Sequence, residues 1–265
     1  MTGSLERAPL LDRAQLLKPI SAIARRAGAA ILQVYATDFD VRGKADASPV
    51  TAADEKAEAL ILSDLRLLTP DIPIVSEEAA AAGKTPAVDA RFWLVDPLDG
   101  TKEFISRNGE FTVNIALIEQ GRPTLGVVFA PALGRLFSGA EGCGAHLDEE
   151  SGSRAITCRA VPGAGLTVVS SRSHGDAAAL DQFLRPRLVA ANVNAGSSLK
   201  FCLVAAGEAD LYPRFGRTME WDTAAGDAVL RAAGGRVTDL DGRDLQYGKP
   251  GFANPHFVAA GLASP

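Results

Sequence analysis

The chain has 265 residues, of which 47% are hydrophobic and 22% charged, and its formal net charge is −5. This length suits one large domain or two smaller ones packed together. The acidic balance excludes a protein that holds nucleic acid through nonspecific phosphate contacts, because such a protein needs an excess of Lys and Arg. No uncharged apolar run approaches the roughly 18 residues of a spanning helix, and no secretory signal is visible. Three scattered cysteines indicate a reducing compartment, with neither a disulfide framework nor metal-ligand spacing.

The first half of the chain predicts two helices followed by a mostly antiparallel sheet. Apolar residues recur every three or four positions over 15–35, as on one face of an amphipathic helix. A second helix is predicted over 52–68, with Thr51 as its N-cap. Short apolar runs predict strands at 72–75 and 91–95, the second ending before Pro97, which turns the chain. Apolar runs separated by Gly and Pro over 111–148 predict a meander of strands.

From about residue 166 the pattern changes to alternating strands and helices. A strand is predicted at 166–171, and strands near the end of the chain at 235–240 and 255–261. Helices are predicted at 177–184, 198–207 and 223–235. The polar stretch 149–165 separates the two patterns. We therefore predict an N-terminal α+β domain over residues 1–160 and a C-terminal α/β domain over residues 161–265.

The most informative segment is WLVDPLDGTKEF, residues 93–104. The predicted strand delivers Asp96 at its carboxyl end, and Asp99 follows three residues later. In a tight turn both carboxylates can point into one pocket, with a peptide carbonyl between them. Such oxygen ligands suit a hard divalent ion, above all Mg²⁺. The N–H groups of Gly100 and Thr101 offer a seat for a phosphate. The alternative is an Asp-rich turn of solvated caps.

Other acids stand at ends of predicted elements. Glu77 and Glu78 directly follow the strand at 72–75, where ligands gather in layered α/β folds, although these two acids by themselves favour an exposed acidic loop. Asp54 lies in the first turn of its helix, where the helix dipole favours a carboxylate. Asp222 is placed to act as the N-cap of the last helix. Taken alone, these two fit a structural role; beside the 96–101 turn they become candidates for a metal site.

Four segments in this order resemble the inositol-monophosphatase-like superfamily of Mg²⁺-dependent, Li⁺-sensitive phosphatases: VTAADEKAE (50–58), VSEE (75–78), DPLDGT (96–101) and WDTAAGDAVLRAAGG (221–235). The stretches KADASPVTAAD, DGTKEFISRNGEFTVNIALI, SSRSH and GSSLKFCLVAAGEADLYPRFG look like its CysQ-type branch, the 3′(2′),5′-bisphosphate nucleotidases. The resemblance runs from the N-terminal helix nearly to the C-terminus. It implies a layered α-β-α-β-α sandwich of the inositol monophosphatase and sugar phosphatase type.

The resemblance also implies roles for particular residues. Two or three Mg²⁺ ions would be bound by Glu77, Asp96, the Leu98 carbonyl, Asp99 and Asp222. The catalytic residues would be Asp54, Thr101 and Glu77, which orient the attacking water and accept its proton. The substrate would be contacted by Leu98, Asp99, Gly100, Thr101, Ser171, His174, Gly196, Ser197, Lys200, Arg214 and Asp222. Lys200 and Arg214 suit a second, non-scissile phosphate, but Arg214 also fits a surface turn and His174 a helix cap.

The activity implied is hydrolysis of the 3′-phosphate of adenosine 3′,5′-bisphosphate to AMP and phosphate, with 3′-phosphoadenylyl sulfate as a second substrate. The resemblance places this reaction in sulfur assimilation. It implies a cytoplasmic monomer or homodimer whose partner is a small nucleotide, and members of the branch can lie on the cytoplasmic face of the inner membrane. We expect neither a nucleic-acid partner nor a transmembrane segment.

Three alternatives stay open at this point. Within the superfamily, the chain could act on inositol monophosphates or related sugar phosphates such as fructose bisphosphate. A haloacid-dehalogenase-type phosphatase also has Asp, Asp, Gly and Thr after a strand, but its two aspartates are two residues apart, whereas Asp96 and Asp99 are three apart with Pro97 between them. A metal or nucleotide sensor that kept the fold would need a broken catalytic apparatus.

Overall fold

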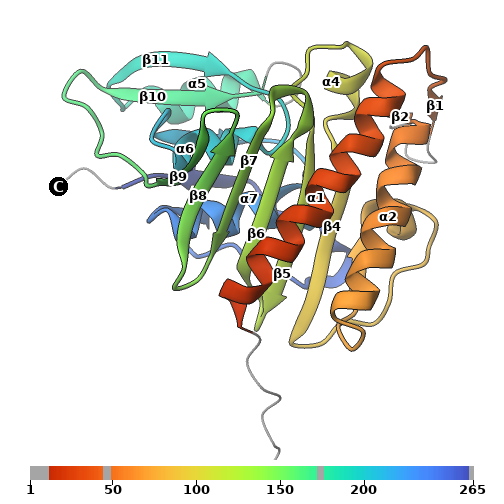
Figure 1. Ribbon diagram of the computed structural model, residues 1–265. Helices are drawn as coiled ribbons and strands as arrows, with labels where there is room; N and C mark the ends of the chain where they lie inside the picture. Colours follow the sequence, from red (N-terminus) through yellow and green to blue (C-terminus); the bar gives the residue numbers. More distant parts are fainter. Residues whose placement is uncertain (1–11, 44–48, 172–175, 263–265) are drawn as a thin grey trace, which may run out of the picture.

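The computed structural model describes residues 12–43, 49–171 and 176–262. These residues are arranged in layers, shown in Figure 1: two long helices, a seven-stranded sheet, two inner helices, a five-stranded sheet and a short outer helix. The layered α/β fold implied by the family resemblance is thereby confirmed. None of the helices in these ranges is long and apolar enough to cross a membrane.

The first sheet is a meander, as the sequence predicts. Its strand order follows the chain, and only its first pair is parallel. The strands are β3 (Ile74–Ser76), β4 (Arg91–Asp99), β5 (Thr112–Glu119), β6 (Arg122–Ala130), β7 (Arg135–Ala140), β8 (Gly144–Glu149) and β9 (Gly152–Ile156). The second sheet is mixed, in the order β11 (Val189–Asn194), β10 (Leu166–Ser170), β12 (Leu211–Arg214), β14 (Phe257–Ala260), β13 (Arg236–Asp239).

One face of the first sheet is covered by α1 (Arg13–Tyr35) and α2 (Ala52–Leu68). The apolar stripe of α1 is buried against β5, β6 and β7, and it includes Ile20 and Ile31, both fully buried. Thr51 is the N-cap of α2, as predicted, and Asp54 completes a capping box with it. A short two-stranded hairpin, β1 (Arg42–Gly43) with β2 (Pro49–Val50), precedes α2.

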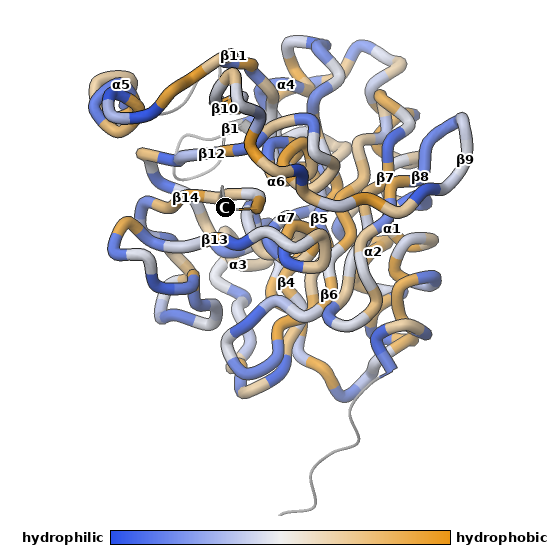
Figure 2. The backbone as a smooth tube through the Cα atoms, turned by 90° about the vertical axis from the view of Figure 1, so that its left-hand side faces the viewer, coloured by the Kyte–Doolittle hydropathy of each residue, from blue (hydrophilic) through white to orange (hydrophobic). Residues whose placement is uncertain are grey.

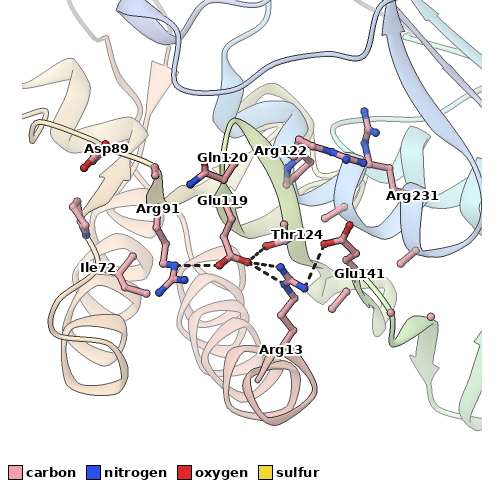
Figure 3. Close-up of a pocket in the computed structure, with 18 of the residues that line it drawn as sticks. Arg13, Ile72, Asp89, Arg91, Glu119, Gln120, Arg122, Thr124, Glu141 and Arg231 are labelled. Atoms are coloured by element: carbon pink, nitrogen blue, oxygen red, sulfur yellow. Dashed lines mark hydrogen bonds and ion pairs between the residues drawn. The ribbon is translucent and has the colours of Figure 1, made fainter. Parts of the chain in front are cut away.

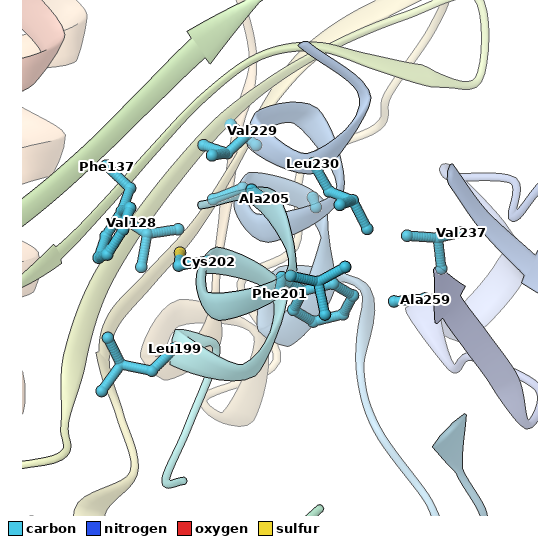
Figure 4. Close-up of a cluster of buried hydrophobic side chains, with 14 of the residues drawn as sticks. Val128, Phe137, Leu199, Phe201, Cys202, Ala205, Val229, Leu230, Val237 and Ala259 are labelled. Atoms are coloured by element: carbon cyan, nitrogen blue, oxygen red, sulfur yellow. The ribbon is translucent and has the colours of Figure 1, made fainter. Parts of the chain in front are cut away.

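Between the two sheets lie α6 (Leu199–Ala205) and α7 (Glu220–Ala232). The helix α7 rests directly on β6, because a Cβ atom on Gly126 would lie only 2.3 Å from the carbonyl oxygen of Ala225. Phe201 and Cys202 of α6 and Val229 of α7 belong to one buried cluster (Figure 4). Figure 2 shows hydrophobic residues along α7, β4 and β6 in the interior, with hydrophilic loops at the rim.

The outer layer is thin. The helix α5 (Ala177–Leu184), whose bounds match the prediction, joins β10 to β11, and none of its residues is buried. It is anchored by Phe183, whose ring lies 5.5 Å from that of Phe215. The first sheet ends at Ile156 and the second begins at Leu166, on either side of the expected division. The domain bounds 1–160 and 161–265 stay a prediction.

Several local expectations need correction. β4 does not end before Pro97 but continues to Asp99, and its pairing with β5 shifts between Asp96 and Asp99. This irregularity accommodates a residue that has no N–H to donate. Two very short helices, α3 (Glu77–Ala81) and α4 (Thr101–Ile105), were not predicted, because five residues are too few to show a helical period. The strands β11 and β12 were not predicted either, because β11 is almost wholly exposed and carries no apolar pattern and β12 has only four residues. Two 3₁₀ turns, Pro131–Leu133 and Pro250–Phe252, complete the described elements.

Candidate active site

A cavity of about 340 Å³ opens at the carboxyl end of β4, where α3, α4, α6 and α7 begin. We call it the carboxylate cavity, because five acids contribute to its wall: Glu77, Asp96, Asp99, Glu103 and Asp222. Most of the site residues expected from the sequence line it: Glu77, Asp96, Leu98, Asp99, Gly100, Thr101, Ser171, Ser197, Lys200, Arg214 and Asp222. The structure thus brings together residues from five separate segments of the chain.

The acids of this cavity repel one another. Burial and the charges of Glu77, Asp99 and Asp222 raise the pKa of Asp96 well above its usual range. Burial and the charges of Asp99 and Glu77 likewise raise the pKa of Asp222. Burial raises the pKa of Asp99 to about 6, against the opposing effect of Lys200. Such a set of buried like charges is stabilised by a bound cation.

The donor set fits a hard divalent ion. Asp99 and Asp222 each use Oδ2 to accept a backbone N–H, from Ser198 at 2.7 Å and from Met219 at 2.8 Å, so the second oxygen of each carboxylate can face a cation. In the described ranges, no three His, Cys, Asp or Glu side chains are grouped so that they could hold one ion together. Mg²⁺ is commonly bound through one or two carboxylates and keeps several waters, so pairs of these acids suit it.

The turn after β4 is shaped for an anion. Gly100 adopts the left-handed conformation, with φ of 87°, and acts as the N-cap of α4. The Thr101 hydroxyl donates to the Leu98 carbonyl at 3.4 Å. Because the first N–H groups of a helix have no partner within the helix, the backbone at Thr101 and Lys102 can donate to phosphate oxygens.

Four cations line the same cavity: Lys102, Lys200, Arg214 and Arg217. Lys200 is only 4% exposed, and its Nζ donates to the carbonyls of Ala195 at 3.3 Å and Ser197 at 2.5 Å. Burial lowers the pKa of Lys200 to about 8, although Asp99 opposes this shift. Arg214 donates to the backbone carbonyl of Arg217 at 3.3 Å, and the exposed Arg217 also lines the cavity. The cavity therefore offers cationic groups beside its acids, as a substrate with two anionic groups requires.

Not every expected residue reaches the cavity. Asp54 and Gly196 are absent from its lining: Asp54 accepts hydrogen bonds from the N–H and hydroxyl of Thr51, both at 2.8 Å, and the Gly196 N–H donates to Glu110. His174 lies outside the described residues. Asp222 is not the N-cap of α7 but its third residue, and its carboxylate accepts the N–H of the N-cap, Met219.

Some lining residues had no signal in the sequence strong enough to single them out. Glu103 is buried beside the turn, and Arg217, Thr218 and Thr223 line the wall near α7. Arg217 stands three residues after Arg214, in a loop with no periodic pattern. Its position could be found only from the path that this loop takes past the cavity.

A second cavity, of about 1420 Å³, lies at the opposite end of β4 (Figure 3). We call it the arginine cavity. Its acid Glu119 accepts hydrogen bonds from Arg13 at 2.8 and 3.0 Å, from Arg91 at 3.1 Å and from Thr124 at 2.8 Å. Burial alone would raise the pKa of Glu119, but these donors together lower it. Cations thus surround Glu119 in this larger cavity, whereas acids surround Asp96 in the carboxylate cavity.

The sequence of residues 12–264 matches the family model of the inositol monophosphatase family. The chain belongs to this family. Members of the inositol monophosphatase family depend on a metal ion, typically Mg²⁺, which agrees with the donor set described above.

Relatives and solved structures place the chain near one branch of this family. It is 53% identical over 247 residues to the 3′(2′),5′-bisphosphate nucleotidase CysQ of Escherichia coli O157:H7, with 91% of this chain and 98% of that protein covered. The crystal structure of CysQ from Bacteroides thetaiotaomicron matches with a TM-score of 0.80 and 35% identity, covering 96% and 99% of the two chains. The inositol monophosphatase from Anabaena matches with a TM-score of 0.74 and 28% identity, covering 93% and 90%.

Proposed function

We propose that this inositol monophosphatase family member is a 3′(2′),5′-bisphosphate nucleotidase. It would be a Mg²⁺-dependent phosphomonoesterase that hydrolyses the 3′-phosphate of adenosine 3′,5′-bisphosphate to AMP and phosphate. The observation that carries the proposal is the composition of the carboxylate cavity, in which five acids, four of them mutually repelling, and four cations share about 340 Å³. The acids suit the metal-assisted cleavage of one phosphate, and the cations suit the binding of a second. The identity to CysQ of Escherichia coli supports the same substrate class.

Glu77, Asp96, Asp99, Asp222 and the Leu98 carbonyl would hold the metal, and Mg²⁺ bound there supplies Lewis-acid stabilisation of the phosphoryl charge and a more acidic water. We propose two or three such ions. The backbone N–H groups of Gly100 and Thr101 would donate to oxygens of the phosphate that is cleaved.

Thr101, together with Asp54 or Glu77, would orient the attacking water and accept its proton. For Asp54 this role requires a move from its capping bonds with Thr51, or a bridging water, because it does not line the cavity. Glu77 lines the cavity and therefore needs neither.

Lys200 and Arg214 would hold the second, non-scissile phosphate, with Ser171, His174, Gly196 and Ser197 around the nucleoside. An ammonium group held by two carbonyls and a guanidinium fixed on a backbone oxygen are pre-oriented donors. A nucleotide that carries only the 3′-phosphate cannot use them. The same cations could take the phosphosulfate group of 3′-phosphoadenylyl sulfate, which we propose as a second substrate.

The proposal places the enzyme in sulfur assimilation, in the cytoplasm, as a monomer or homodimer. Peripheral contact with the inner membrane is part of what the family branch suggests, and it stays a prediction.

The experiment that tests the proposal measures phosphate release with Mg²⁺ from adenosine 3′,5′-bisphosphate, 5′-AMP and inositol 1-phosphate in parallel, each with and without Li⁺. We expect much faster release of phosphate from the bisphosphate than from the other two compounds. We expect Li⁺ to abolish this hydrolysis. A preference for inositol 1-phosphate would overturn the substrate assignment while keeping the metal site. Release from none of the three would overturn the proposed activity.

A further inference from the structure

Three buried polar residues outside the carboxylate cavity connect the acids at the end of β4 with the segment that precedes α6. Thr112 and Asn114 on β5 and Ser198 before α6 are each at most 2% exposed. The Asn114 Oδ1 lies 3.1 Å from the Thr112 hydroxyl and 2.7 Å from the Ser198 hydroxyl, and these two hydroxyls are 2.8 Å apart. The amide oxygen only accepts and each hydroxyl carries one proton, so two of these three contacts are hydrogen bonds at any moment. Together they hold the elements that carry them in a fixed relative position.

This set of residues leads directly to a proposed metal ligand. The Asn114 Nδ2 lies 3.4 Å from Oδ2 of Asp99, and the Ser198 N–H donates to the same oxygen at 2.7 Å. An ionised carboxylate only accepts hydrogen bonds, so the amide of Asn114 must turn its NH₂ to Asp99 and its oxygen to the hydroxyls. The orientation of the Asn114 amide is therefore determined by Asp99, whereas either partner can donate in the Thr112–Ser198 contact.

The same residues also reach the segment that positions Lys200. The Thr112 hydroxyl lies 3.1 Å from that of Ser197, and the Ser197 carbonyl accepts from Lys200 Nζ. Ser197 has a φ of 42°, in the left-handed region, and its Cβ would be 3.1 Å from a Cβ on Gly100. A residue other than glycine keeps such a conformation only when its surroundings hold it there.

Ser198 itself indicates that this connection is specific. It stands at the N-cap of α6, where a serine side chain usually caps the first N–H groups of the helix, yet it makes no such bond. Its hydroxyl turns to Asn114 instead. The local capping bond is thus exchanged for a contact with a residue 84 positions away along the chain.

We propose that Thr112, Asn114 and Ser198 are positioning residues that hold the Ala195–Lys200 segment at a fixed separation from Asp99, and so set which spacing of two phosphates the enzyme accepts. This inference rests on the proposed function. Asp99 and Asp96 are paired with Thr112 and Asn114 in the strand ladder, whereas residues 195–198 lie in no strand or helix. Loss of the hydrogen bonds is therefore expected to displace residues 195–198, whose Ala195 and Ser197 carbonyls position Lys200, and to leave the acids in place.

The test compares kcat and KM on two nucleotides that differ only in the second phosphate, adenosine 3′,5′-bisphosphate and adenosine 3′-monophosphate. We expect Ser198→Ala and Thr112→Val each to raise KM for the bisphosphate about 10- to 100-fold. We expect kcat/KM for the monophosphate to change by less than about threefold. Thr112→Ser keeps the hydroxyl and is expected to restore the wild-type preference.

A matched control is Thr124→Val on β6. Thr124 is also buried, and its hydroxyl donates to Glu119 in the arginine cavity. This variant is expected to lower Tm without changing the preference between the two nucleotides. The positioning role is wrong if Thr112→Val and Ser198→Ala reduce kcat/KM equally for both nucleotides. It is also wrong if the ratio of the two kcat/KM values stays within twofold of wild type.

A readout independent of turnover separates this inference from the proposed function. Hydrogen exchange at the amide of Ser198, which is bonded to Asp99, should be about tenfold faster in Thr112→Val and unchanged in Thr124→Val. If the wild-type enzyme does not hydrolyse the bisphosphate, the proposed function fails, and the exchange rates alone then decide on the positioning role. Equal exchange in both variants would overturn that role.

Discussion

The two ends of β4 place acids in opposite electrostatic surroundings. At one end Arg91 enters the arginine cavity, where Glu119 is enclosed by Arg13, Arg91 and Thr124 and has a lowered pKa. At the other end Asp96 enters the carboxylate cavity, where other acids raise its pKa. The first arrangement stabilises the fold without a ligand. In the second arrangement the acids repel one another, and a bound cation would relieve this repulsion.

This difference teaches that charge, and not volume, distinguishes the proposed active site from the other cavity. The arginine cavity is about four times larger, yet its buried acid already has its counter-charges within the chain. The carboxylate cavity is small and polar, and its acids are arranged at a cost to stability. Groups that are unfavourable for folding and gathered in one cavity are the expected signature of a site selected for chemistry.

The largest expected effect comes from neutralising one acid of the carboxylate cavity. We expect Asp96→Asn to reduce kcat on adenosine 3′,5′-bisphosphate by a factor on the order of 10³, since a proposed metal ligand is lost. The free energy of unfolding of the metal-free protein should stay the same or rise, because one of four repelling charges is gone. Steady-state kinetics and urea unfolding in EDTA measure the two quantities. A large loss of stability would contradict the repulsive arrangement.

The same change at the other end of β4 should have the reverse effect. We expect Glu119→Gln to lower the free energy of unfolding by about 2–3 kcal/mol, because two arginines lose their counter-charge next to a side chain that is 9% exposed. Its kcat and KM should equal those of wild type. Asp241→Asn is the matched control, since its ion pair with Arg243 is largely exposed and is worth at most about 0.5 kcal/mol.

Replacing Lys200 tests the cationic part of the carboxylate cavity. We expect Lys200→Met, which keeps the apolar stem, to raise KM for adenosine 3′,5′-bisphosphate about 10- to 30-fold through loss of one charge-assisted hydrogen bond. Turnover of adenosine 3′-monophosphate should be nearly unchanged. Equal losses on both nucleotides would remove Lys200 from the role of binding the second phosphate. Initial rates over a range of substrate concentrations separate the two cases.

The sequence predicts what is local, and the structure adds what is distant. Thr51 as the start of α2 was predictable, because a capping box is completed within four residues. The carboxylates of Asp96 and Asp99 were placed in one pocket from their spacing alone, although β4 continues further than expected. By contrast, Ser198 and Asn114 meet across 84 residues, and Arg217 reaches the cavity on an irregular loop. Neither the Ser198–Asn114 contact nor the position of Arg217 is indicated by a periodic pattern in the sequence.

The smallest expected effect is a difference in pH dependence between the two ends. The pKa of Glu119 is lowered on folding, so its contribution to stability is present above about pH 4.5 and is lost as the pH falls below that value. The pKa of Asp99 is raised to about 6, so the native protein binds more protons than the unfolded chain between about pH 4 and 6. The carboxylate cavity therefore lowers the free energy of unfolding as the pH rises through this range.

Urea unfolding in EDTA at pH 4, 5, 6 and 7 separates the pH dependence that comes from Glu119 from the pH dependence that comes from the carboxylate cavity. The free energies of unfolding of wild type and Glu119→Gln should become equal as the pH falls, because protonated Glu119 no longer pairs with its arginines. The free energy of unfolding of Asp96→Asn should instead rise relative to that of wild type as the pH increases, because the raised pKa of Asp96 makes its ionisation unfavourable in the native state. Saturating Mg²⁺ should cancel this gain at pH 7, since the wild-type acids then share a cation. If Mg²⁺ changed the unfolding of Glu119→Gln and wild type by different amounts, the two cavities would not be electrostatically independent.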